Sequence, residues 1–309
     1  MQPAHVPLQP VELPWLAQAA VRLAVLRLDL IDPEVSGNKW FKLALPLRAA
    51  RSSGARGLIS LGGPHSNHLH ALAAAARRAG LPSVGLLRGE PQSTPTVEDL
   101  QAFGMRLHWL GYGGYRERHR ADFFDPWRAR YPGFLCLPEG GGGLAGAQGC
   151  APLVAQVREQ LAALGWEDHD GWWLAAGTGT TLAGLVMGEA VGLRHPVHGA
   201  LAGPWLRGVA QTVDGLLDAA ALPREGYRLI DASRGGFGRF DRELARFLVE
   251  TERFGGIPLE PVYTAKAMMA LRLYVEAGYF AAGTRLIFVH TGGLQGRRAA
   301  QAQLDELLR

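Results

Sequence analysis

Residues 36–43, SGNKWFKL, contain Lys39 and Lys42, and the only other lysine of the chain is Lys266. Lysine and arginine together number 32, so the chain uses arginine almost everywhere that it needs a cation. A lysine amine can form a Schiff base with a carbonyl group, a reaction that arginine does not undergo. Lys39 follows Asn38, one of only two asparagines, at the predicted start of a helix. Lys39 is therefore a candidate nucleophile, although chance retention on a solvated helix would give the same pattern.

A second polar cluster, GGPHSNHLH, covers residues 62–70 at a predicted junction between a strand and a helix. Ser66 and Asn67 fall in the first helical turn, where hydroxyl, amide and free main-chain N–H groups can bind a carboxylate or an oxyanion. Ser66 could equally be a helix cap. The cluster also contains three histidines, His65, His68 and His70. A zinc site would need a further ligand, and none is spaced nearby, so we expect no metal.

A third cluster, AAGTGTTLAGL, covers residues 175–185 and joins a hydrophobic strand to a helix. Its turn consists of Gly177, Thr178, Gly179, Thr180 and Thr181. Glycines let main-chain N–H groups approach an anion, hydroxyls add donors, and the helix N-terminus adds its dipole. The turn matches neither the P-loop nor the dinucleotide-binding spacing. It predicts a phosphate-binding cup, with a tight turn that binds no ligand as the alternative.

Three further hydroxyl groups stand beside apolar strands or helix starts. Tyr263 and Thr264 belong to PVYTAKAM (261–268), and Thr291 belongs to VHTGG (289–293). Each of them alone is more often a cap or a satisfied core group than a catalyst.

These clusters fall between strands and helices that alternate along the chain. Apolar runs predict strands at 25–32, 57–63, 171–177 and 285–293. One helix is predicted from about residue 38, which Pro46 should end or kink, and another over 66–82. Such alternation indicates an α/β fold with parallel sheets flanked by helices, whose ligands bind at the carboxyl ends of the strands. Two such blocks, 48–150 and 151–309, are separated by a glycine-rich stretch, and 1–47 could join either.

The composition excludes several classes of protein. The 309 residues carry a net charge of only +4, and no basic run of the kind that binds nucleic acid is present. The two cysteines, Cys136 and Cys150, form no CxxC pair, which excludes a disulfide scaffold and a zinc ribbon. We read no signal peptide and no membrane-spanning segment, so the expected location is the cytoplasm.

Five motifs together carry a resemblance that none of them carries alone. In chain order they are GNK (37–39), GGPHSNH (62–68), GTGTTLAGL (177–185), PVYTAKAM (261–268) and HTGG (290–293). This order resembles the pyridoxal-phosphate enzymes of the tryptophan-synthase-β fold type, most closely the D-cysteine desulfhydrase and 1-aminocyclopropane-1-carboxylate deaminase family. The resemblance implies a homodimer, a large domain made of 1–47 plus 151–309, a small domain at 48–150, and an active site between them.

The resemblance also implies a role for each matching residue. Lys39 looks like the lysine that forms the Schiff base with pyridoxal 5'-phosphate, and Asn67 like the residue bonded to the phenolic oxygen of the cofactor. Ser66 and His68, with the main chain of Asn67, resemble the cradle for the substrate carboxylate, and His65 stands beside it. The turn from Gly177 to Thr181 resembles the phosphate cup. Tyr263 corresponds to an active-site tyrosine near the substrate, and Thr264 to the group that faces the pyridine nitrogen.

Two positions favour one activity within this family. Thr264 stands where the cyclopropane deaminases have glutamate, and Thr291 where they have leucine. A neutral hydroxyl gives a weaker electron sink than a carboxylate beside the pyridine nitrogen, which suffices to expel a good leaving group such as thiolate. We therefore predict α,β-elimination of D-cysteine to pyruvate, sulfide and ammonia.

Departures from the family pattern leave alternatives open. His65 stands where glutamine is usual, His70 stands where arginine is frequent, and the loop PEGGGG lacks the expected serine–asparagine pair. Other β-substituted D-amino acids and the cyclopropane amino acid are alternative substrates. A protein that binds pyridoxal phosphate or an amino acid without catalysis is the alternative of another class.

Overall fold

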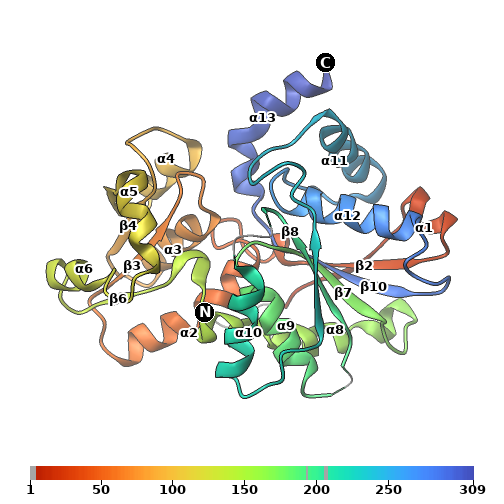
Figure 1. The fold of residues 1–309 in the computed structure, drawn as a ribbon, viewed down its shortest axis with the longest axis horizontal. Coiled ribbons are helices and arrows are strands. Elements are labelled where there is room, and N and C mark those ends of the chain that lie inside the picture. The colour runs from red at the N-terminus through yellow and green to blue at the C-terminus, as the bar shows by residue number, and fades with distance from the viewer. Residues whose placement is uncertain (1–4, 193, 205–207) are drawn as a thin grey trace.

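The computed structural model describes residues 5–192, 194–204 and 208–309 and contains two β-sheets, each flanked by helices (Figure 1). The larger sheet has six strands, which in spatial order are β1 (Leu8–Val11), β2 (Arg22–Arg27), β10 (Arg285–His290), β7 (Gly171–Ala176), β8 (Val197–Leu201) and β9 (Tyr227–Asp231). All neighbouring pairs are parallel except the pair of β1 with β2. The expected α/β class with mostly parallel sheets is confirmed.

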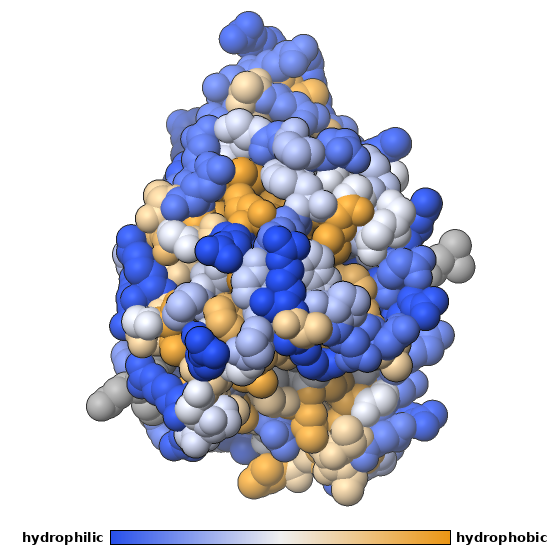
Figure 2. All heavy atoms as spheres, turned by 90° about the vertical axis from the view of Figure 1, so that its left-hand side faces the viewer, coloured by the Kyte–Doolittle hydropathy of each residue, from blue (hydrophilic) through white to orange (hydrophobic). Residues whose placement is uncertain are grey.

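The smaller sheet is wholly parallel, and its strands all come from the chain between β2 and β7. In spatial order they are β5 (Arg106–Trp109), β4 (Ser83–Leu87), β3 (Gly57–Gly62) and β6 (Phe134–Cys136). Figure 2 views the molecule from the side of this sheet. Hydrophilic side chains cover most of that face, and hydrophobic ones form separate patches among them.

Helices lie on both faces of each sheet. Those of the smaller sheet are α3 (Asn67–Arg78), α4 (Pro95–Ala102), α5 (Gly111–Arg116) and α6 (Asp125–Arg130). On one face of the larger sheet lie α7 (Leu144–Cys150), α8 (Pro152–Arg158), α9 (Thr180–Glu189) and α10 (Val209–Ala219). On the other face lie α1 (Pro14–Gln18), α11 (Arg242–Gly255) and α12 (Thr264–Glu276), while α13 (Leu294–Leu308) packs against α4 and α11.

The sequence of β7 shows why helices cover both faces of the larger sheet. Trp172 points into the core on the side of α9, whereas its neighbour Trp173 points into the core on the side of α12, because side chains alternate along a strand. Both rings are fully buried. Continuous apolar strands of this kind are typical of parallel sheets with helices on both faces.

Helix α2 (Asn38–Ser52) contributes to the cores of both sheets. Phe41 packs with the larger sheet, whereas Leu43, Leu47 and Ala50 pack with the smaller one. Pro46 was expected to end or kink this helix, and the helix continues through it to Ser52, so it does not end there. The strand expected at 25–32 also stops early, at Arg27, where a 3₁₀ turn, Leu28–Leu30, follows.

We propose that the two sheets mark two domains, with some adjustment of the expected boundaries. The expected boundary after residue 47 lies inside α2, and α7, expected in the small domain, packs against α2 and α9. No helix in the described part of the chain is long and apolar enough to cross a membrane.

The close packing of α7 on α9 generates a stability prediction. A Cβ atom on Gly184 would lie 2.4 Å from the carbonyl oxygen of Ala147 and 2.6 Å from Cβ of Cys150. Because main-chain atoms cannot move aside cheaply, Gly184→Ala should lower the free energy of unfolding by about 1–3 kcal/mol. Urea denaturation measures this change.

Gly215→Ala is the matched control, because Gly215 also lies in a helix, α10, with nothing within 4 Å of an added Cβ. That variant should be neutral or more stable by about 0.5–1 kcal/mol. Equal effects of the two substitutions would contradict the packing described for α7 and α9.

Candidate functional site

The turn that carries Lys39 is pressed against the end of β10. Gly37 has a φ of 69°, and a Cβ atom on it would lie 2.1 Å from the carbonyl oxygen of Thr291. The main-chain N–H of Asn38 donates to that same oxygen at 3.1 Å. Only glycine permits both the positive φ and this close approach, so the sequence GNK fixes the start of α2 beside β10.

Asn38 links the amine of Lys39 to the predicted phosphate cup. The side-chain Nδ2 of Asn38 donates to Oγ1 of Thr181 at 2.9 Å, and its Oδ1 accepts from Nζ of Lys39 at 2.8 Å. Burial lowers the pKa of Lys39 to about 8. The amine therefore lies close to the cup, and a considerable fraction of it is neutral near that pH.

The cup is the turn between β7 and α9. Gly179 has a left-handed conformation with a φ of 77°, and the hydroxyls of Thr178 and Thr180 lie 2.9 Å apart. The first-turn N–H groups of α9 have no partner within the helix and face the turn. Hydroxyls and N–H donors at a positive helix end fit an anionic phosphate group.

A second buried lysine faces this cup, and the sequence analysis assigned it no role. Nζ of Lys42 lies 3.5 Å from Oγ1 of Thr178, and the residue is 3% exposed. Burial, and then the charge of Lys39, hold the pKa of Lys42 well below its usual value. No carboxylate in the described part of the chain forms an ion pair with Lys42. A bound phosphate would supply the missing counter-charge, so these residues fit pyridoxal phosphate. The signal in the sequence was the spacing of three from Lys39 on one helix.

The N-terminus of α3 forms the facing wall. Ser66 caps this helix by accepting the N–H of Leu69 at 3.1 Å. Oδ1 of Asn67 accepts from Nε2 of Gln295, a residue of α13 that the sequence analysis did not single out. Added Cβ atoms on Gly293 and Gly296 would lie within 3.3 Å of the Asn67 amide, so the two helix starts are in close contact. The site therefore brings together segments from both sheets.

The three histidines near this wall point to different partners. His65 is exposed, whereas His68 is buried with Nε2 2.8 Å from Oγ of Ser60. His70 uses its two ring nitrogens on the carbonyl oxygen of Glu34 and on Asp99. In residues 5–192, 194–204 and 208–309 these histidines belong to no group of ligand atoms close enough to hold a metal. The zinc alternative at 65–70 therefore has no geometric support.

Tyr263 and Thr264 lie at the start of α12. A Cβ atom on Gly177 would lie 3.1 Å from Cε1 of Tyr263, so the tyrosine ring lies against the cup. Thr264 is fully buried, and its hydroxyl accepts from the N–H of Glu260 at 2.9 Å and lies 3.3 Å from Oε1 of Glu260. Glu260, which the sequence analysis also missed, accepts the N–H groups of residues 262–264. Burial raises the pKa of this carboxyl.

The third lysine has a structural role. Lys266 is 1% exposed and donates from Nζ to the carbonyl oxygens of Ser233 and Gly236, both at 2.8 Å. Burial lowers its pKa to about 8. A compact ammonium group fits these converging carbonyls, which explains the retention of a lysine here without any chemistry.

Comparisons with known proteins identify the family and the fold of this chain. A family model described as "Pyridoxal-phosphate dependent enzyme" matches residues 3–292. A Pyrococcus abyssi protein, named as a presumed 1-aminocyclopropane-1-carboxylate deaminase, is 28% identical over 301 residues, which cover 94% of this chain and 90% of that protein. The D-cysteine desulfhydrase of Salmonella choleraesuis is 29% identical over 303 residues, with 91% and 90% covered.

A solved structure of an "ACC deaminase homologue" superimposes with a TM-score of 0.86 at 26% identity, and covers 99% of this chain and 94% of its own. The match extends through both sheets. The expected tryptophan-synthase-β-like fold is thereby confirmed.

The position of Lys42 generates a binding prediction. Lys42→Met should weaken the affinity for pyridoxal phosphate by roughly 10–100-fold, because a hydrogen bond to a charged group contributes about 1.5–3 kcal/mol. Fluorescence titration of the cofactor-free protein measures the affinity.

Pyridoxal without its phosphate is the matched control ligand, and its affinity should change little in Lys42→Met. A comparable loss for both ligands would contradict the assignment of Lys42 to the phosphate and would indicate a general disturbance of α2.

Proposed function

This chain belongs to the pyridoxal-phosphate-dependent enzymes, as a lyase that acts on small amino acids, and we propose that it catalyses α,β-elimination of D-cysteine. The reaction consumes one water and yields pyruvate, hydrogen sulfide and ammonia. The observation that carries the proposal is the hydrogen-bonded chain from the Lys39 amine through Asn38 to Thr181. It holds a reactive amine beside a turn that fits a phosphate group.

Lys39 moves the proton in this proposal. Bound pyridoxal phosphate supplies a sink for the electron pair that remains when a bond at Cα of the substrate breaks. Lys39 accepts the Cα proton at Nζ, and a pKa of about 8 leaves enough neutral amine for this role near physiological pH. Asn38 limits the directions in which Nζ can point, because its Oδ1 holds the amine in the resting arrangement.

The other site residues bind and orient. The turn from Gly177 to Thr181, with Lys42, binds the phosphate group. The hydroxyl of Ser66 and the first-turn N–H groups of Asn67 and His68 bind the substrate carboxylate. Because the His68 ring is bonded to Ser60, we assign this residue to the cradle through its main chain.

Thr264 and Thr291 support the choice of substrate. The desulfhydrase pattern has threonine at both positions. The hydroxyl of Thr264 is neutral, whereas a stronger electron sink would need a carboxylate beside the pyridine nitrogen of the cofactor. The names of the relatives include both activities, so elimination on another β-substituted D-amino acid and opening of the cyclopropane amino acid are the alternatives. We also propose that the chain works as a homodimer, as the resemblance implies.

A screen for keto-acid release tests the function. Purified protein with pyridoxal phosphate should release pyruvate and sulfide in equal amounts from D-cysteine, and more slowly from D-serine, whose leaving group is poorer. Lys39→Ala should lower the rate by roughly 10²–10⁴-fold, because it removes the proton acceptor at Cα. Pyruvate and sulfide assays measure both products.

The screen should also contain L-cysteine, β-chloroalanine and 1-aminocyclopropane-1-carboxylate. Lys266→Arg is a control for the general effect of replacing a buried lysine, because Lys266 donates to the main-chain carbonyls of Ser233 and Gly236, which belong neither to α2 nor to the cup. Release from the cyclopropane amino acid alone would contradict our interpretation of Thr264 and Thr291.

The contact between Gln295 and Asn67 generates a prediction about cofactor orientation. Oε1 of Gln295 accepts from Oγ1 of Thr96 at 3.2 Å, so its Nε2 is the atom that donates to Oδ1 of Asn67. This relay leaves Nδ2 of Asn67 as a donor for the phenolic oxygen of the cofactor. Gln295→Leu should reduce cofactor affinity by about fivefold, since a neutral hydrogen bond contributes about 1 kcal/mol, and should shift the pH at which the visible absorption of the bound cofactor changes.

Gln303→Leu is the matched control, because Gln303 is exposed on the same helix, α13. Gln295→Glu should disturb the absorption at least as much as Gln295→Leu, because a carboxylate can only accept and would turn the Asn67 amide around. An unchanged pH profile in both Gln295 variants would rule out the relay.

A further inference from the structure

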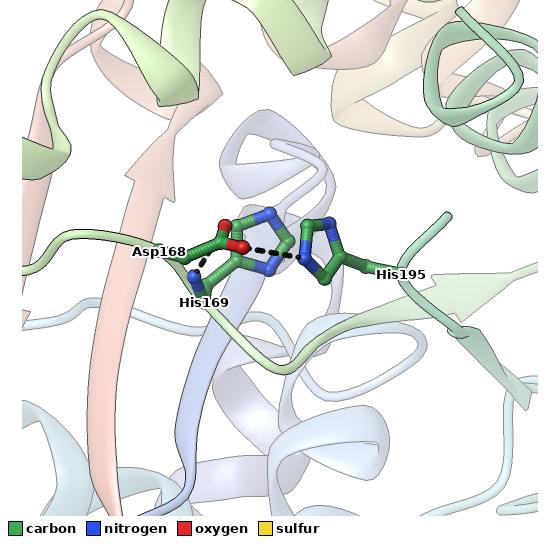
Figure 3. Close-up of side chains that lie close together, drawn as sticks. All are labelled: Asp168, His169 and His195. Carbon is green, nitrogen blue, oxygen red and sulfur yellow. Dashed lines mark hydrogen bonds and ion pairs between the residues drawn. The ribbon is translucent and has the colours of Figure 1, made fainter. Parts of the chain in front are cut away.

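A cluster of potential metal ligands lies at the opposite end of the larger sheet from the proposed active site. Asp168 and His169 precede β7, and His195 precedes β8 (Figure 3). Glu189, the last residue of α9, lies beside them. The ten residues of α9 span about 15 Å, which separates this cluster from the phosphate cup at the other end of the helix.

The spacing of the three side chains suits a small cation. One ligand atom from each of Asp168, His169 and His195 lies within 4.8 Å of the others. Oδ2 of Asp168 and Nε2 of His195 are 3.2 Å apart, and the centroids of the two imidazole rings are 4.1 Å apart. Ligands of a tetrahedral zinc ion, with bonds of about 2.0–2.1 Å, stand roughly 3.3 Å from one another. The separations among the three ligand atoms therefore exceed this value by at most about 1.5 Å.

His169 provides independent evidence for a missing partner. The residue is 1% exposed, and neither of its ring nitrogens has a hydrogen-bond partner among the residues that the structure describes. The nearest carboxylate oxygen, Oε1 of Glu189, is 3.7 Å from Nε2. Buried polar atoms in native proteins are almost always paired, and an unpaired one requires an explanation. A bound ion would provide the partner for one of these nitrogens.

Glu189 supplies the outer support that metal-binding histidines usually have. This buried carboxylate lies 3.1 Å from Nδ1 of His195, so that Nε2 of the same ring faces Asp168. It is itself held by Nε1 of Trp172 at 2.7 Å and by Arg158 at 2.9 Å. A carboxylate on the far nitrogen fixes the tautomer and the orientation of a ligating imidazole. Because Arg158 balances Glu189, Asp168 is the carboxylate whose charge the cation would offset.

A water molecule can reach the ion from the side of Asp168, whose side chain is 34% exposed. A surface depression of about 240 Å³ adjoins the cluster, and it is lined by His195 and Glu189 but not by Asp168 or His169. Two imidazoles and one carboxylate with an open fourth position form a ligand set typical of zinc.

We propose that Asp168, His169 and His195 bind one Zn²⁺ ion, with Glu189 as the outer carboxylate and a water molecule as the fourth ligand. The ion joins the segments that lead into β7 and β8 and the C-terminal end of α9. Its expected role is to stabilise the larger sheet.

Titration of the cofactor-loaded protein with Zn²⁺ tests the proposal. After treatment with chelator and dialysis, the wild-type protein should bind one Zn²⁺ per chain, measured by calorimetry and by elemental analysis. Binding to the folded state should raise the Tm by roughly 5 °C or more at saturation. Asp168→Asn and His195→Ala should each weaken the affinity at least about tenfold.

Asp170→Asn is the matched control, because Asp170 lies in the same loop but bonds to Arg285. It should bind zinc like the wild type, and so should Lys39→Ala, which separates this site from the proposed active site. Asp168→Asn is the variant expected to fold normally, since its side chain is partly exposed; its Tm without metal checks this. The absence of stoichiometric binding, or equal affinity in the wild type, Asp168→Asn and His195→Ala, would overturn the proposal.

Discussion

The hydrogen bond from the amide of Asn38 to the hydroxyl of Thr181 joins two segments that are 143 residues apart. It sets the position of the Lys39 amine relative to the proposed phosphate cup, because the other end of the same amide accepts from Nζ of Lys39. An amide can donate and accept at once, whereas an aspartate or a leucine at this position could not do both. Asn38 is buried, so breaking this link would also leave an unpaired polar group in a dry environment.

This link works because α2 is shared by the two cores. Phe41 is fixed in the core of the larger sheet, while Leu47 and Ala50 are fixed in that of the smaller one. Lys39 and Lys42 lie on the first turns of this helix, directly beside the cup. Any relative movement of the two sheets must therefore act on α2, and with it on the two amines. The helix provides a direct mechanical connection between the wall formed by α3 and the proposed site of chemistry.

The sequence predicts those parts of the site whose conformation depends on residues that are close to one another in the chain. The positive φ of Gly37, the turn from Gly177 to Thr181 and the capped start of α3 all follow from residues within a few positions of one another. Pro46 shows the limit of such rules, because packing on two cores keeps α2 helical beyond a residue that ordinarily breaks a helix.

The features that the sequence analysis missed depend on distant partners. Lys42 meets Thr178 across 136 residues, and Gln295 meets Asn67 across 228. Glu260 is the exception, because its three N–H partners lie within four residues of it, and only its burial depends on the surrounding fold. Neither a lysine on a helix nor a glutamine near a chain end differs locally from a solvated residue. Their roles become visible only when the sheets bring the segments together.

Helix α9 relates the two proposed sites to one another. Its N-terminus carries a partial positive charge and, with Thr180 and Thr181 in its first turn, favours an anion in the cup. Its C-terminus carries a partial negative charge and ends at Glu189, where Arg158 and His195 gather. A cation there and a phosphate at the other end would both be stabilised by the same helix dipole. Because α9 is packed closely on α7 through Gly184, a constraint on its C-terminal end would also restrict the cup at its start.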